Sequence, residues 1–366
     1  MKLKYLSKLL VLAALFNSAP ANALVLLQQV SVLTGVDYDT NPTLATSNEV
    51  AIWRYTAAPK YTASLVDDRN RWFATAGLNL QRSSNKAISE NRQDPSISGG
   101  WQHEYEKGFY NLTVDYTKAS SRLNEFTTTG IVDKDGSATS KSISASWSRL
   151  LTERLNLSVA GQYLQIDYTG SGFTNYNTKS VNSSLSYQLN EKLNPFLQVA
   201  VSDLSSEGGG SQSRISQSYL VGTTAQINPN LDMSVSLGLN HQQASGNGWV
   251  ANSTLTYLGE KYNLQGTLSR NVTASGLGQF QSTDNISLRY SYDLSDKSRA
   301  GTDFNWSSNA SNGGNETRQL GGWYTKELSD LWQFKLSLNL KELKNNTQSA
   351  NSSIFGISFI YNTLDF

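Results

Sequence analysis

Apolar and polar residues alternate with a period of two along most of this chain. Successive side chains of a β-strand point to opposite faces, so the pattern predicts strands with one apolar and one polar face. Within residues 231–240, for example, Leu231 and Met233 flank Asp232. No helical stripe at spacings of three and four competes with this alternation. The sequence is therefore expected to fold almost entirely into β-strands. Further clear examples are residues 142–148, 181–189 and 334–341.

Eighteen segments carry the alternation, and turn-forming residues separate them. An even number of consecutive antiparallel strands is typical of up-and-down barrels of the outer membrane. We therefore predict an all-β chain that forms one antiparallel transmembrane β-barrel of about 18 strands. The expected strands are residues 27–38, 50–66, 71–83, 95–105, 109–120, 138–150, 155–168, 176–189, 194–205, 212–227, 230–244, 248–258, 261–274, 280–292, 298–309, 315–328, 331–343 and 351–362.

The connections between these segments alternate in length. Those after even-numbered strands are short, as at residues 67–70 and 106–108, whereas those after odd-numbered strands are mostly longer, as at residues 39–49 and 121–137. Residues 244–247 are a short exception. Outer-membrane barrels have short periplasmic turns and longer outer loops. The alternation therefore predicts a barrel whose N-terminus lies in the periplasm.

Several of the short turns share an apolar residue, a polar residue, an acid and a base. Examples are residues 151–154, 189–192 and 294–297. Asn, Asp and Ser favour tight turns in any protein, so ordinary turn chemistry and a common hairpin ancestor both explain the pattern.

Alternation alone does not decide which face of the barrel is apolar. Strands in this number enclose a space too wide for side chains to fill, and the polar face consists mainly of Ser, Thr, Asn, Gln and Gly. We therefore expect the apolar face to contact lipid and the polar face to line the lumen. The charged residues expected on the lumen face are Arg54, Asp115, Arg214, Asp232, Arg289, Asp303 and Lys335. The aromatic residues expected in belts at the membrane interfaces are Trp53, Tyr55, Trp72, Tyr105, Phe109, Tyr168, Tyr187, Tyr257, Tyr262, Tyr292 and Trp332.

Residues 1–23 have the pattern of a secretory signal peptide. Three lysines precede a short apolar run, and Ala21-Asn22-Ala23 fits the small-x-small cleavage motif. The run is shorter than the roughly 20 apolar residues that a membrane-spanning helix needs. We therefore expect cleavage after Ala23 and a single barrel domain over residues 24–366, without a plug or a periplasmic domain.

Charge and cysteine content narrow the class of protein further. The chain has 30 basic and 29 acidic residues, and loss of the three signal lysines leaves 27 against 29, a net charge of −2. A nucleic-acid-binding protein would carry a basic stripe, so no nucleic-acid partner is expected. Cys is absent, so an exported chain of this kind is stabilised without disulfides.

Residues for a catalytic or metal site are scarce. The histidines are His103 and His241, and without Cys the chain has neither a thiolate ligand nor a thiol nucleophile. Gly208-Gly209-Gly210 lacks the Gly-Lys that follows in a phosphate-binding loop, and no Gly-x-Ser-x-Gly elbow is present. We expect no enzymatic activity, cofactor or metal. A barrel enzyme, such as a lipid hydrolase or protease with a Ser/His or Asp/His cluster near one rim, is the alternative.

The last expected strand carries Phe355, Ile357, Phe359 and Tyr361 on one face, and the chain stops at Phe366. A terminal aromatic after such a strand resembles the end of bacterial outer-membrane barrels. The resemblance implies recognition by the barrel assembly machinery. Tyr361 and Phe366 fall on opposite phases, which departs from the usual pattern and implies a bulge or an early end of the strand.

The segment from Gly35 to Pro42, with the recurrent Leu-x-Glu-Arg/Lys turns, resembles a family of outer-membrane β-barrel porins associated with exopolysaccharide biosynthesis and export. The likeness extends over nearly all of residues 24–366, but its motifs are turns and strands, so no functional residue is carried over. It implies an 18-stranded barrel that lets a secreted polysaccharide cross the outer membrane, with a polysaccharide export complex as a partner.

These features predict a passive pore in the outer membrane of a Gram-negative bacterium, for polar solutes or a secreted polysaccharide. The alternatives are a non-conducting structural or adhesive surface barrel and a general diffusion porin unrelated to polysaccharide. Outer-membrane lipid and the assembly machinery are the other expected partners. A candidate constriction loop, for which a mobile outer loop with solvated charges is the alternative, carries Arg122, Glu125, Asp133, Lys134 and Asp135.

Overall fold

The structure is a computed structural model that describes residues 24–126, 135–170, 172–207, 214–243, 246–309, 314–345 and 348–363. The predicted signal peptide and Phe366 lie outside these residues. The elements are β1 (Val25–Asp39), β2 (Ile52–Val66), β3 (Asn70–Ser83), β4 (Arg92–Tyr105), β5 (Gly108–Ser120), α2 (Ser121–Glu125), β6 (Ser137–Leu150), β7 (Leu155–Thr169), β8 (Tyr176–Tyr187), β9 (Leu193–Ser206), β10 (Arg214–Asn228), β11 (Leu231–Gln242), β12 (Gly246–Leu258), β13 (Tyr262–Ala274), β14 (Phe280–Ser295), β15 (Ser298–Asn309), β16 (Asn315–Glu327), β17 (Trp332–Lys344) and β18 (Ser349–Asn362).

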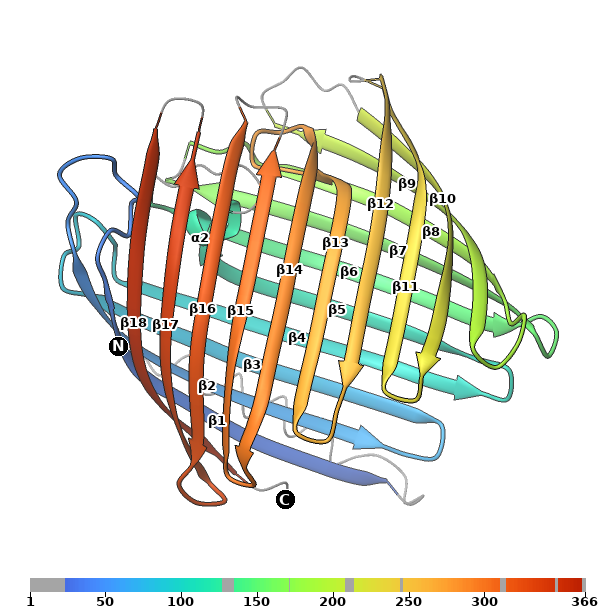
Figure 1. The fold of residues 1–366 in the computed structure, drawn as a ribbon, viewed down its shortest axis with the longest axis horizontal. Helices are drawn as coiled ribbons and strands as arrows, with labels where there is room; N and C mark the ends of the chain where they lie inside the picture. Colours follow the sequence, from blue (N-terminus) through green and yellow to red (C-terminus); the bar gives the residue numbers. More distant parts are fainter. Residues whose placement is uncertain are drawn as a thin grey trace.

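Each strand pairs antiparallel with the next, and the sheet closes on itself (Figure 1). Nine residue pairs join β1 to β18, from Ser31 opposite Asn362 to Asp39 opposite Ile354. Closure matters because backbone groups in hydrocarbon have no water partner, and only helices and closed barrels satisfy all of them. The predicted all-β barrel of 18 strands is confirmed. No helix in the described part of the chain is long and apolar enough to cross a membrane.

The strand boundaries follow the sequence pattern closely. The largest differences are three residues, at Arg92 where residue 95 was expected to start β4 and at Ser295 where residue 292 was expected to end β14. β18 pairs without a register shift and ends at Asn362, so the strand itself shows no bulge.

The connections alternate in length over the first half of the barrel. Those after β1, β3 and β5 span 12, 8 and 16 residues, whereas those after β2, β4 and β6 span 3, 2 and 4. From β11 onward both kinds span two to five residues, so the predicted alternation holds where the long loops cluster and fades elsewhere.

The recurrent turn sequences give a recurrent turn structure in three places. The amide of Leu151 donates to the Leu155 carbonyl, and Leu189 and Leu328 make the same bond four residues ahead, at 2.8–3.0 Å. The turn at residues 296–297 is tighter, because Ser295 already pairs with Ser298. At Asp67, hydrogen bonds from the backbone N–H groups of Arg69 and Asn70 hold the pKa of the carboxyl below its ordinary value.

Large apolar side chains lie exposed on one face of the strands. Leu197, Val221, Leu237 and Leu239 are each more than half exposed, as expected for a face that contacts lipid rather than a protein core. The same face carries ion pairs near the long-loop ends of the strands, such as Lys141 with Asp167 at 2.9 Å. The apolar band therefore ends before the rim that carries the long connections, and the strands extend past it.

Two of the residues expected in the aromatic belts lie on the other face. Tyr168 is 9% exposed and belongs to a cluster with Tyr176 and Leu204 inside the rim that carries the long connections. Phe109 pairs with Ser148, whereas the adjacent Tyr110 pairs with Trp147 on the outward face. The belt prediction was wrong for Tyr168 and Phe109 because proximity to a strand end does not fix the face.

Candidate functional site: the lumen and the segment inside it

The charged residues expected in the lumen lie on the strand faces opposite the exposed apolar side chains. Arg54 sits between the exposed Trp53 and Tyr55, and Arg289 sits between the exposed Leu288 and Tyr290. Asp115, Arg214, Asp232, Asp303 and Lys335 have the same phase on their own strands.

Several of these charges are held by partners on neighbouring strands. Arg54 bridges Asp37 at 2.6 Å and Asp39 at 3.1 Å. Arg289 pairs with Asp303 at 2.7 Å, where the Arg289 side chain is 69% exposed. The lumen face therefore carries fixed ion pairs, and the second of them is open to solvent.

Two other predicted lumen residues make neutral contacts. The hydroxyl of Ser142 donates to Asp115 at 3.4 Å. Arg214 donates to the carbonyl of Gly278 at 3.0 Å, and so fixes the β13–β14 connection to β10.

The segment that follows β5 folds inside the ring of strands as α2 (Figure 1). Ser121 and Glu125 at its two ends are fully buried. Arg122 donates to the carbonyls of Pro42 and Ile88 at 3.4 and 3.3 Å, and these lie in the connections after β1 and β3. The inner segment is thus tied to the two other long connections of the same side.

One wall of the barrel holds Glu125. Its carboxylate accepts hydrogen bonds from the hydroxyl of Tyr168 on β7 and from the amide of Gly276 in the β13–β14 connection. The neighbouring Asn124 also donates to the Tyr168 hydroxyl, at 3.4 Å. The buried carboxylate therefore has the donors that a charge removed from water requires.

The opposite wall holds Phe126. Its ring packs with Leu44, Ala350 and Leu343, and the Lys341 ammonium lies 5.4 Å from the ring centroid. Tyr168 is on β7 and Lys341 on β17, eight strands apart through β18 and β1 in a ring of eighteen. Residues 121–126 therefore contact nearly opposite walls of the lumen.

The far end of the same connection is anchored by Arg92. This buried side chain pairs with Asp94 at 2.8 Å and donates to the Gly136 carbonyl, also at 2.8 Å. Asp135 lies 3.9 Å from Arg92 and accepts from the Glu90 amide at 3.1 Å. Of the predicted constriction residues, the structure places Glu125 and Asp135 against the barrel and Arg122 against the connections after β1 and β3. Asp133 and Lys134 lie outside the described residues.

Sequence reasoning missed most partners in this site. Asp37 and Asp39 share the phase of the lumen face and lie next to Arg54, so alternation across the first hairpin was enough to find them. Nothing in the sequence pointed to Tyr168, because its partner Glu125 lies 43 residues away. No group of three or more His, Cys, Asp or Glu side chains that could hold a metal occurs among the described residues.

No protein-family model matches the sequence, and no curated protein matches it. Solved structures do match. OccAB4 of Acinetobacter baumannii aligns with a TM-score of 0.52 at 9% identity, over 95% of this chain and 100% of its own. The outer membrane protein OpdK of Pseudomonas aeruginosa aligns with a TM-score of 0.52 at 9% identity, over 93% and 99%. OccK5 (OpdH) of the same species gives 0.50 at 10% identity, over 93% and 98%.

These likenesses define the class of fold: the chain has the closed β-barrel of bacterial outer-membrane porins. At this low identity the structural likeness shows the fold alone and assigns no residue roles.

Proposed function

We propose that this protein is a pore of the bacterial outer membrane that passes small polar solutes through a lumen narrowed by residues 121–126. The observation that carries the proposal is the contact of this segment with nearly opposite walls, through Tyr168 on one side and Lys341 on the other. Barrels of 16 to 18 strands leave an aqueous channel unless something fills it. An inward segment anchored on both sides narrows that channel and leaves it open.

The charges beside the segment suit small hydrated solutes. Arg54, Asp37 and Asp39 line the wall near Lys341, so both signs are present at the narrow level. The absence of a single dominant sign supports a channel of modest ion preference. A general diffusion porin fits the same observations equally well.

Passage of a secreted polysaccharide stays a prediction from the sequence resemblance alone. Neither the inner segment nor the described charges favour a polymer over a small solute. The signal peptide, the assembly machinery and an export complex likewise stay predictions.

Conductance of the refolded chain from residue 24 onward, measured in a planar bilayer, tests the proposal. We expect discrete current steps, and larger steps when residues 121–134 are replaced by a short Gly-Ser linker. Replacing residues 151–154 in the short β6–β7 turn in the same way is the control, and should leave the steps unchanged. A folded but silent barrel, with or without the inner segment, would overturn the pore and favour the structural or adhesive barrel.

A further inference from the structure

Three aromatic side chains on the lumen face share one arrangement. Phe73 is paired with Gly100, Phe196 with Gly222 and Trp323 with Gly301, each on the neighbouring strand. Each ring occupies the space above its glycine, since a Cβ atom built there would lie 2.4–2.5 Å from a ring atom. The rings therefore lie close against the barrel wall.

The three pairs also lie at one level of the barrel. Phe73 is the fourth residue of β3, Phe196 is the fourth residue of β9 and Gly301 is the fourth residue of β15, all counted from the short-turn end. The three pairs join β3 to β4, β9 to β10 and β15 to β16, with Trp323 on β16, so the pairs are six strands apart in a ring of eighteen. The aromatic rings are thus spaced by thirds around the mouth of the lumen on the short-turn side. We call the three side chains Phe73, Phe196 and Trp323 the aromatic triad.

The surroundings of the aromatic triad are polar and accessible. Each of the three side chains is half-buried. The indole Nε1 of Trp323 donates to Asp303 at 3.1 Å, and Asp303 pairs with the exposed Arg289. Beside Phe73, the hydroxyls of Thr62 and Thr75 lie 3.3 Å apart. Ser186 on β8 lies opposite Phe196, so each of the three aromatic side chains has a neighbour that can donate or accept hydrogen bonds.

Packing over glycine does not by itself explain the positions of the aromatic triad. Aromatic side chains do cover glycines in strands and stabilise the sheet there. Other lumen-face glycines are covered differently, by Ser96 at Gly77, Asn339 at Gly321 and Ser337 at Gly356. A glycine on this face thus needs no aromatic neighbour, and the three that have one lie at a single level.

We propose that the aromatic triad binds sugar rings as they enter or leave the lumen. This inference rests on the proposed pore function. A pyranose presents a flat C–H face and an edge of hydroxyls. The apolar face packs on an aromatic side chain, and the hydroxyls find the carboxylate, guanidinium and hydroxyl groups beside it. The substrate class is therefore neutral mono- and oligosaccharides, weakly held at up to three points.

Block of single-channel current by maltohexaose, added on the short-turn side, tests this inference. Polyethylene glycol of equal hydrodynamic size controls for volume exclusion. We expect maltohexaose to block at lower concentration than the polymer. Each of Phe73→Leu, Phe196→Leu and Trp323→Leu should raise the half-blocking concentration by about two- to tenfold, which corresponds to the usual worth of an aromatic contact.

Phe359→Leu is the matched control, because Phe359 lies exposed on the lipid face, and it should leave the block unchanged. Calorimetric titration of maltohexaose into the folded barrel in detergent reads binding without conductance. A conducting barrel whose sugar block is unaffected by the three substitutions, or no stronger than the polymer's, overturns the inference. A silent barrel that binds the sugar through the three residues overturns the pore and keeps the inference.

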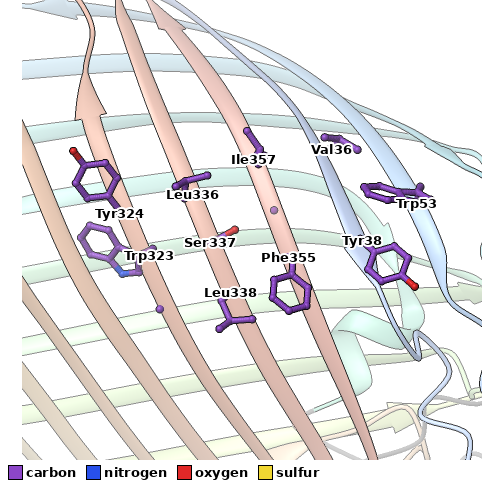
Figure 2. A pocket seen from close by; sticks show the side chains of 12 residues that line it. Val36, Tyr38, Trp53, Trp323, Tyr324, Leu336, Ser337, Leu338, Phe355 and Ile357 are labelled. Carbon is purple, nitrogen blue, oxygen red and sulfur yellow. The ribbon is translucent and has the colours of Figure 1, made fainter.

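A second apolar surface lies on the opposite face of the barrel wall. A groove on the lipid face runs over β16, β17, β18, β1 and β2 and is lined by Tyr324, Leu336, Phe355 and Trp53 (Figure 2). Its position on the lipid face leaves the surrounding lipid as its occupant.

Discussion

The carboxylate of Glu125 accepts a hydrogen bond from the phenol of Tyr168, and this contact joins the inner segment to the barrel wall. Glu125 is 1% exposed, so the acid has exchanged water for protein donors. The next residue, Phe126, packs against the wall formed by β17 and β18. Two consecutive residues therefore fix the segment across the lumen.

Tyr168→Phe should loosen the inner segment without unfolding the barrel. The substitution removes one donor from a buried carboxylate, which costs about 1–3 kcal/mol. The barrel keeps its strand pairing, so the effect falls on the segment. Single-channel records should show added fluctuation to a higher current level. Tyr163→Phe on the outward face of β7 is the control, and identical records for Tyr168→Phe and the parent would contradict the anchoring role.

Arg54→Gln should make the pore more selective for cations. Arg54 neutralises Asp37 and Asp39, which lie 2.6 and 3.1 Å from it. Without the guanidinium, two carboxylates face the lumen near the narrow level and attract cations. The reversal potential in a KCl gradient measures the change. Arg270→Gln, on the outward face, should leave the reversal potential unaltered, and a shift toward anions in Arg54→Gln would contradict the placement.

The sequence predicts the barrel well because its periodicity is local. The alternation of Leu231 and Asp232 follows from strand geometry alone, and repetition of the pattern locates the ends of the strands. Closure follows from strand number and from the need to pair every backbone group. These arguments need no knowledge of distant contacts.

The site is less predictable because its contacts join distant residues. Composition suggests that residues 121–137 carry charge, but both an inward and an outward loop agree with that. The choice depends on Glu125 meeting Tyr168 and Phe126 meeting Ala350, which are 43 and 224 residues apart. The aromatic triad is equally hard to predict, since the even spacing of its members, such as Phe73 and Phe196, emerges only when the barrel closes.

A charge on the lipid face should destabilise the barrel far more than one on the lumen face. Leu237 lies mid-strand on β11 and is 58% exposed to the surroundings of the barrel. Leu237→Arg is expected to cost about 2–4 kcal/mol of folding free energy in a bilayer. Ser234→Arg, on the opposite face of the same strand, is the control and should fold nearly as well as the parent. Urea-dependent folding into lipid vesicles measures both. Equal losses would contradict the assignment of Leu237 to the lipid face, and a larger loss in Ser234→Arg would mean that the two faces are reversed.

The seam between β1 and β18 gives a direct test of closure, since the chain has no cysteine of its own. Ser31 lies opposite Asn362, and directly opposed residues have Cβ atoms about 4.5–5.5 Å apart, close to the span of a disulfide. Ser31→Cys combined with Asn362→Cys should therefore cross-link on mild oxidation of the folded barrel. Ser31→Cys combined with Ile360→Cys represents a slip of two residues, where the Cβ atoms are about 7–8 Å apart, and should not. Cross-linking is detected as a difference in gel mobility before and after reduction. A disulfide in the second pair and not the first would mean that the barrel closes in a shifted register, which would move Asp37 and Asp39 relative to Lys341 and change the charges at the narrow level of the lumen.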